Sequence, residues 1–255
     1  MKILALDSSG LVAGVALTQD DTLVAEYTTN YKKTHSQTLL PMLDEIKKMV
    51  ELDLHTIDVI AVAAGPGSFT GLRIGSATAK GLGLALQVPL AAIPTVDALA
   101  YNLYGTDKLV CPLMDARRSQ VYTGLYTFER KGADFALCTR LSQCALPVAE
   151  IAEKINALGR EVIFLGDGVP VYRTLLEKLL TVPYSFAPAH CNCQRAACVA
   201  ALGAVYAKEG RLVSADAFAP EYLRMSQAER ERMEASEAQK EAMKAGITPG
   251  SHREA

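Results

Sequence analysis

The sequence has 255 residues, half of them hydrophobic, and a formal net charge of -2 at pH 7. A chain of this length can bury a sizeable core in one large domain or two small ones. The charge balance argues against a basic nucleic-acid surface, and no uninterrupted apolar stretch is long enough to span a bilayer. Met1-Lys2 runs straight into a strand pattern without a signal peptide, so we expect a cytoplasmic protein with no membrane contact.

The first half of the chain follows the pattern strand, strand, strand, helix, strand, helix, strand, helix. Apolar runs and amphipathic spacing place these elements. The expected ranges are strands over 2–7, 11–18 and 22–29, a helix over about 34–50, a strand over 58–64, a helix ending near residue 86, a strand over 89–93 and a helix over 95–103.

A similar order starts again after the break at 105–107. The expected ranges are strands over 109–115, 120–128 and 134–141, a helix over 147–158, a strand over 161–165, and helices over 169–180 and 195–208. Leu4–Asp7 can be laid over Pro112–Asp115, a weak internal repeat that implies two structurally similar halves. We therefore expect an N-terminal half over 1–105 with dimerisation helices, a C-terminal half over 106–225, and a charged tail over 226–255, helical at first and then disordered.

Gly65–Gly75, a glycine-rich stretch between a buried strand and an apolar helix, organises the first half. Such turns often hold phosphate, because free N–H groups at a helix start favour anions. This stretch matches neither the P-loop nor the dinucleotide spacing of glycines. A tight turn that leads into a packing helix is therefore favoured over a phosphate site.

The helix after this turn carries a small residue at every fourth position, which forms one stripe along its surface. The stripe consists of Gly71, Gly75, Ala79 and Gly83. Glycine in a helix costs roughly 0.5–1 kcal/mol relative to alanine, so a compensating close approach of another backbone is expected. We predict that this stripe contacts a partner, with Arg73 and Lys80 on another face and the helix of His35, Leu39 and Leu43 alongside.

The six cysteines form no CxxC pair, and Cys191-Asn192-Cys193 has only His190 beside it. This spacing is weak for zinc, so reduced thiols and no metal site are expected. His35 has no nucleophile or orienting acid near it in sequence, and a capping or interface role is favoured over that of a general base. No residues are predicted to be catalytic.

The duplicated pattern, with an aspartate at the end of each first strand, resembles the actin-like ATPase fold (ASKHA, ribonuclease H-like). Four motifs indicate one family within this fold, and they are Leu4–Ser9, His35–Pro41, Gly65–Gly75 and Pro220–Arg224. Together they resemble the bacterial TsaB (YeaZ) family over residues 1–225. The resemblance implies a part in making threonylcarbamoyladenosine (t6A) at position 37 of tRNAs. It implies as partners the catalytic paralogue TsaD and the ATPase TsaE, a homodimer on the same face when TsaD is absent, and tRNA contact only through the complex.

The resemblance also implies that the catalytic chemistry of the paralogue is lost here. Thr95 and Leu99 stand where TsaD carries a metal-binding histidine pair, and neither side chain can replace an imidazole. Asp7, Ser8 and Ser9 match positions that hold phosphate or magnesium-bound water in actin-like ATPases, and Asp115 matches a carboxylate of the same cleft. The four residues are read as a possible vestigial nucleotide site. Local turn bonding is favoured for Asp7 and Ser8, and a solvated strand end for Asp115. No cofactor of its own is expected, although ATP or ADP at the partner interface stays open. The alternative is a stand-alone actin-like ATPase or small-molecule kinase.

Overall fold

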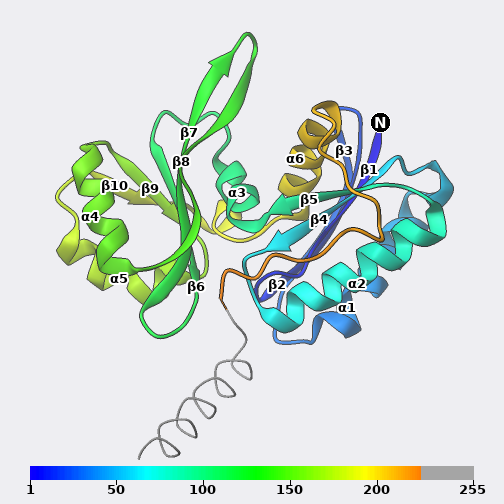
Figure 1. Cartoon of the computed structure of the whole chain (residues 1–255), viewed down its shortest axis with the longest axis horizontal. Coiled ribbons are helices and arrows are strands. Elements are labelled where there is room, and N and C mark those ends of the chain that lie inside the picture. The colour runs from blue at the N-terminus through cyan, green and yellow to red at the C-terminus, as the bar shows by residue number, and fades with distance from the viewer. Residues whose placement is uncertain (225–255) are drawn as a thin grey trace, which may run out of the picture. The chain divides into compact units, whose positions relative to one another are not determined.

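Two five-stranded mixed sheets organise the computed structural model, which describes residues 1–224 (Figure 1). Residues 1–223 form one compact unit. The tail predicted over 226–255 lies outside the described residues. No helix in the described part of the chain has the length and apolar character needed to cross a membrane.

The first sheet has the strand order β3-β2-β1-β4-β5, with β1 at its centre. Its strands are β1 (Lys2–Asp7), β2 (Val12–Gln19), β3 (Thr22–Asn30), β4 (Val59–Gly65) and β5 (Leu90–Pro94). β1 runs antiparallel to β2 and parallel to β4. One face packs on α1 (His35–Met49) and α2 (Phe69–Leu86), and the other on α6 (Ala196–Lys208). Each of these helices buries its apolar side chains against the alternating residues of the strands.

The second sheet repeats this plan in the order β10-β9-β6-β7-β8. Its strands are β6 (Leu109–Asp115), β7 (Gln120–Lys131), β8 (Asp134–Pro147), β9 (Val162–Leu165) and β10 (Tyr184–Phe186). α4 (Val148–Leu158) and α5 (Gly168–Leu179) share one core with it, and α3 (Thr95–Ala100) shares another with β6 and β7. Short 3-10 segments cover Leu54–Thr56, Tyr101–Leu103 and Ala189–Cys191.

This repetition confirms the predicted duplicated actin-like fold. In each sheet, the strand that comes first in the chain is central; it runs antiparallel to the second strand in chain order and parallel to the fourth. Asp7 and Asp115 end these two central strands. The three-residue strand β10 was not predicted, because so short a segment has no readable period. β7 and β8 extend to Lys131 and Pro147, beyond the predicted ends.

The helix α6 departs from the simple division of the sequence into two halves. It follows the second set of strands, yet it packs against β1, β2, β4 and β5 of the first sheet. A Cβ added to Gly203 would lie 2.7 Å from the Cβ of Ala61, so the helix backbone comes unusually close to the sheet. Val213 then pairs with Leu90 of β5. The predicted boundary near residue 105 thus separates the strands but not all the elements that pack on them.

Candidate functional site

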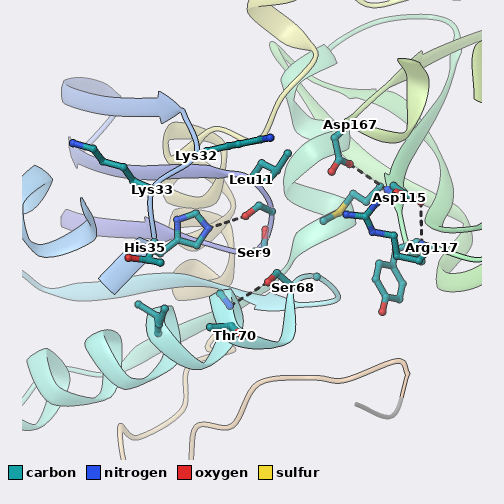
Figure 2. A pocket seen from close by; sticks show the side chains of 18 of the residues that line it. Ser9, Leu11, Lys32, Lys33, His35, Ser68, Thr70, Asp115, Arg117 and Asp167 are labelled. Carbon is teal, nitrogen blue, oxygen red and sulfur yellow. Dashed lines mark hydrogen bonds and ion pairs between the residues drawn. The ribbon is translucent and has the colours of Figure 1, made fainter. Parts of the chain in front are cut away.

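A cavity of about 430 Å³ lies where the ends of the two central strands face each other. It is bordered by the β1–β2 turn, the starts of α1 and α2, and the turn after β6. Figure 2 shows Lys32, Lys33 and His35 on one side and Asp115, Arg117 and Asp167 on the other. Both signs of charge therefore border the cavity.

The turn after β1 holds Asp7 in a local hydrogen-bonding pattern. Asp7 is 1% exposed, and its Oδ1 accepts hydrogen bonds from the backbone N–H of Ser9 at 2.9 Å and from the Ser9 hydroxyl at 2.7 Å. Its Oδ2 has no partner among the described residues. Burial raises the pKa of this carboxyl group. Asp7 lies outside the cavity lining, whereas Ser9 lines it, so the favoured reading of Asp7 as a turn residue fits this geometry.

Ser8 joins this turn to α2 rather than to its own backbone. Its hydroxyl donates a hydrogen bond to the carbonyl oxygen of Gly71 at 2.8 Å. The N–H of Ser68 donates to the carbonyl of Ser9 at 2.7 Å, and a Cβ on Gly67 would lie 2.2 Å from that same oxygen. The glycine-rich stretch therefore packs against the β1–β2 turn and commits N–H groups that an anion would need. This arrangement is the packing turn favoured from the sequence.

The turn after β6 has a different conformation. Arg117, Arg118 and Ser119 all have positive φ, at 64°, 55° and 57°, a region that non-glycine residues seldom occupy. Asp115 accepts hydrogen bonds from the N–H of Arg117 and from the Tyr172 hydroxyl, and its own N–H donates to Asp167. Asp115 is therefore held by protein groups, not left as the solvated strand end expected from the sequence.

The pKa of Asp167 is raised, chiefly because burial penalises its charged form. The N–H of Asp115 acts in the opposite direction by hydrogen bonding to the ionised carboxylate. On this side of the cavity, the backbone of Asp115 is thus bonded to the side chain of Asp167.

His35 begins α1 and anchors it to the first turn. Its Nε2 lies 2.8 Å from the carbonyl oxygen of Gly10, which can only accept, so Nε2 carries the proton. Nδ1 is buried without a partner among the described residues. His35 borders the cavity, not the outer surface of the helix pair.

The prediction that the small-residue stripe contacts a partner is wrong. A Cβ on Gly71 would lie 2.0 Å from the carbonyl of Ser8, and one on Gly75 would lie 2.4 Å from its hydroxyl. Ala79 is fully buried, and a Cβ on Gly83 would meet Leu90 at 2.5 Å. The compensating close approach exists, but it is to the β1–β2 turn and the first sheet of the same chain. Leu39 and Leu43 also lie in this core, at 1% and 5% exposure.

The two predicted basic residues of α2 have different surroundings. Arg73 is exposed, and its guanidinium carbon lies 4.1 Å above the ring of Phe69. Lys80 donates to the carbonyl oxygens of Asp216 and Phe218, at 3.1 and 2.9 Å. Lys80 therefore ties the C-terminal segment to α2, and only Arg73 is presented outward.

The outward face of α2 is a second row, displaced around the helix from the predicted stripe. We call it the outer row; all its members are exposed, and they are Thr70, Arg73, Ala77, Gly81 and Leu84. A Cβ on Gly81 would meet nothing within 4 Å, and Leu84 is 51% exposed. On α1, Pro41 and Glu45 border a groove beside β3. At 100° per residue, Leu40 lies on a different side of that helix, toward α2, and is 52% exposed. Together these residues form an uncovered surface with apolar members on both helices.

The C-terminal motif closes over the glycine-rich stretch, a contact that the sequence did not reveal. The N–H of Glu221 donates to the carbonyl of Ala64 at 2.7 Å, and its carboxylate accepts from Gln143 of β8. Tyr222 lies against Phe69 with ring centroids 4.6 Å apart. A Cβ on Gly65 would be 2.1 Å from the Glu221 carbonyl, and the φ of Gly65 is +122°. The motifs at 65–75 and 220–224 are thus two sides of one packing contact.

Comparison with known proteins shows the family of this chain. Residues 22–232 match the family model "TsaD: tRNA N6-adenosine threonylcarbamoyltransferase". The chain is 34% identical over 229 residues to the tRNA threonylcarbamoyladenosine biosynthesis protein TsaB of Bacillus subtilis, covering 90% of this chain and 96% of that protein. The TsaB of Escherichia coli is 30% identical over 171 residues, 66% of this chain and 72% of its own. The chain belongs to the TsaB (YeaZ) branch of the TsaD family. The solved YeaZ of Pseudomonas aeruginosa agrees, with a TM-score of 0.72 and 28% identity over 87% of this chain and 99% of that one.

In this TsaB-family chain, the two positions compared with the TsaD histidines have structural roles. Thr95 is fully buried, and its hydroxyl accepts a hydrogen bond from the N–H of Gly65 at 3.2 Å. Leu99 is 1% exposed and belongs to the core between α3 and the second sheet. Within residues 1–224, no group of three or more His, Cys, Asp or Glu side chains is placed to hold a metal ion.

Proposed function

We propose that this chain is a non-catalytic subunit of the cytoplasmic machinery that makes t6A at adenosine 37 of tRNAs, and that it acts by binding TsaD. The observation that carries the proposal is the match to the Bacillus subtilis protein, which spans nearly the full length of that relative and bears the name of this pathway. TsaE is proposed as a further partner of the same complex. The chain is proposed to meet tRNA only through that complex, which accords with its net charge of -2.

Three features of the site support a non-catalytic role. Asp7 is buried behind the cavity, with one oxygen engaged by Ser9. The glycine-rich turn commits the N–H of Ser68 to the protein's own backbone. Thr95 and Leu99 fill their positions with a buried hydroxyl contact and an apolar core contact. A catalytic centre of the TsaD kind would need ligands at these positions that the chain does not carry.

The outer row of α2 and the neighbouring Leu40 of α1 are the proposed contact surface for TsaD. Small side chains at Ala77 and Gly81 allow a partner helix to approach closely, while Leu84 and Leu40 supply apolar area. Arg73 adds a cation at one end, suited to an acidic partner group. In the absence of TsaD, two copies of this chain are proposed to pair through the same face. The homodimer and the TsaD complex then exclude each other.

No nucleotide is proposed to be bound by the chain alone. In the complex, the cavity between the two central strands is the proposed place for ATP or ADP, because Lys32, Lys33 and Arg117 border it with positive charge. Asp115 and Asp167, on the same side of the cavity as Arg117, oppose an unassisted anion, so a partner must complete such a site.

The test is a reconstituted tRNA threonylcarbamoylation assay with the activated threonylcarbamoyl-adenylate supplied. We expect no t6A from this chain alone, and formation with TsaD and TsaE that depends on its addition. ATP turnover by the chain alone, measured with and without Mg²⁺, should not exceed background. Modification by the chain alone would contradict the scaffold role, and substantial ATP turnover would favour the alternative of a stand-alone ATPase or kinase.

A further inference from the structure

A second cavity, of about 390 Å³, lies beside α6 and away from the site described above. Its floor is the alanine-rich face of α6, formed by Ala197, Ala200, Ala201 and Ala204. Tyr101, Tyr104 and Phe135 form an aromatic wall. The β2–β3 turn and the start of β8 complete the rim. The proposed function uses none of these residues.

The aromatic wall is fixed in place before any ligand arrives. The hydroxyl of Tyr104 accepts a hydrogen bond from the N–H of Phe135 at 2.7 Å, and the two rings meet edge to face with centroids 5.7 Å apart. Tyr101 packs against Tyr104 at 5.3 Å. Gly105, at φ +80°, lets the chain turn so tightly that a Cβ would touch the Phe135 ring at 3.3 Å. Ring faces held in this way attract cations without a further ordering cost.

The rim of the cavity carries three carboxylates and the ammonium group of one lysine. Asp20 and Asp21 belong to the β2–β3 turn, Asp134 begins β8, and Lys208 ends α6. Asp20 is paired with the N-terminal ammonium group of Met1. Asp21 and Asp134 have no ion pair within the described residues, and both are exposed. The rim therefore has two separate anionic ends, one on each hairpin, with apolar floor between them.

Tyr101 adds a polar group that stays neutral. Burial raises the pKa of Tyr101 to about 12, and the nearby Tyr104, Cys198 and Asp134 act in the same direction. At neutral pH its hydroxyl is therefore protonated and contributes no charge to the cavity.

We propose that this cavity binds a linear alkyl polyamine, with one ammonium group at Asp21, another at Asp134 and the methylene chain on the alanine floor. The match is between two cationic ends joined by an apolar spacer and two anionic ends joined by an apolar floor. The aromatic wall contacts the ammonium group nearest Asp134. A nucleotide or an acidic peptide would be repelled by the same rim.

The test is isothermal titration of the full chain with spermidine and with 1,4-diaminobutane at fixed, low ionic strength. Asp134→Asn should weaken binding about two- to fivefold, the effect of losing one partly exposed ion pair. Lys208→Gln should strengthen binding by a similar factor, because it removes a cation from the rim. Tyr104→Ala should weaken binding about two- to fivefold, while Tyr104→Phe, which keeps the ring face, should weaken it less.

Two matched controls make the outcome decisive. Lys178 lies in the last turn of α5 as Lys208 lies in the last turn of α6, and both are exposed, so Lys178→Gln removes the same charge elsewhere. Asp216 is an exposed carboxylate away from the cavity. Neither Lys178→Gln nor Asp216→Asn should change the affinity. The proposal is overturned if spermidine does not bind, if each control shifts affinity as much as its partner, or if butylamine binds as tightly as 1,4-diaminobutane.

Discussion

Two glycines of α2, six residues apart, should respond in opposite directions to the same substitution. Gly75 faces the core, and a Cβ there would lie 2.4 Å from the Ser8 hydroxyl. Ser8 must then move, which breaks or weakens its buried hydrogen bond to Gly71, a loss of about 0.5–1.5 kcal/mol. Overpacking adds a further loss of stability of about 1–3 kcal/mol. The higher helix propensity of alanine offsets about 0.5–1 kcal/mol of this total. Gly75→Ala should therefore lower the free energy of unfolding by about 1–3 kcal/mol.

Gly81 lies on the outer row and meets nothing within 4 Å of an added Cβ. Gly81→Ala should raise the free energy of unfolding by about 0.5–1 kcal/mol, since only the helix preference changes. At about 2–4 °C per kcal/mol, the melting temperature should fall by roughly 2–12 °C for Gly75→Ala and rise by roughly 1–4 °C for Gly81→Ala. Calorimetric melting and urea titration measure both. An unchanged or higher melting temperature for Gly75→Ala, or a lower one for Gly81→Ala, would show that the two faces of α2 are wrongly assigned.

Two further predictions concern the first turn and the C-terminal motif. Burial raises the pKa of Asp7 in the folded state, so folding favours its protonated form and the free energy of unfolding should lose this contribution as pH rises above about 4. The Asp7→Asn side chain cannot ionise and keeps an oxygen that can accept from Ser9. In urea titrations, the free energy of unfolding of Asp7→Asn should therefore rise relative to that of the wild type as pH increases. A pH-independent difference between the two would contradict this prediction. Tyr222→Ala removes a ring contact of about 0.5–1.5 kcal/mol and should lower the melting temperature by roughly 1–6 °C, whereas the exposed Tyr31→Ala should change it little. Equal shifts for both tyrosines would rule out a specific role for the Phe69 contact.

The sequence predicted the fold well because its signals are local and repeated. Short runs of apolar and β-branched residues bounded by turn residues place β1 to β3, and the aspartates at the ends of β1 and β6 reveal the duplication. It did not predict where α6 packs, because an alanine-rich helix that is apolar on most sides does not indicate which sheet it covers. The contact between Glu221 and Ala64 joins residues 157 positions apart in the sequence and leaves no periodic signal.

The small-residue stripe of α2 was correctly predicted to be a place of close backbone approach, but it was wrongly assigned to a partner-binding surface. Gly71 and Gly75 do mark a close backbone approach, as the spacing predicts. The spacing cannot say whether the approaching backbone belongs to the same chain. The outer row was missed because a single exposed glycine and alanine pair, Gly81 and Ala77, is not distinctive in sequence.

The proposed scaffold role requires that the outer row of α2 binds TsaD. Ala77→Glu places a charge and added bulk in the middle of this row, and Ala157→Glu makes the same change on an exposed position of α4. Neither side chain enters the core, so both variants should melt near the wild-type temperature. Binding to purified TsaD is measured by analytical ultracentrifugation. Ala77→Glu should raise the dissociation constant about ten- to a hundredfold, corresponding to roughly 1–3 kcal/mol of binding free energy, and Ala157→Glu should leave it unchanged. Wild-type affinity for TsaD in a folded Ala77→Glu protein would contradict the proposed interface.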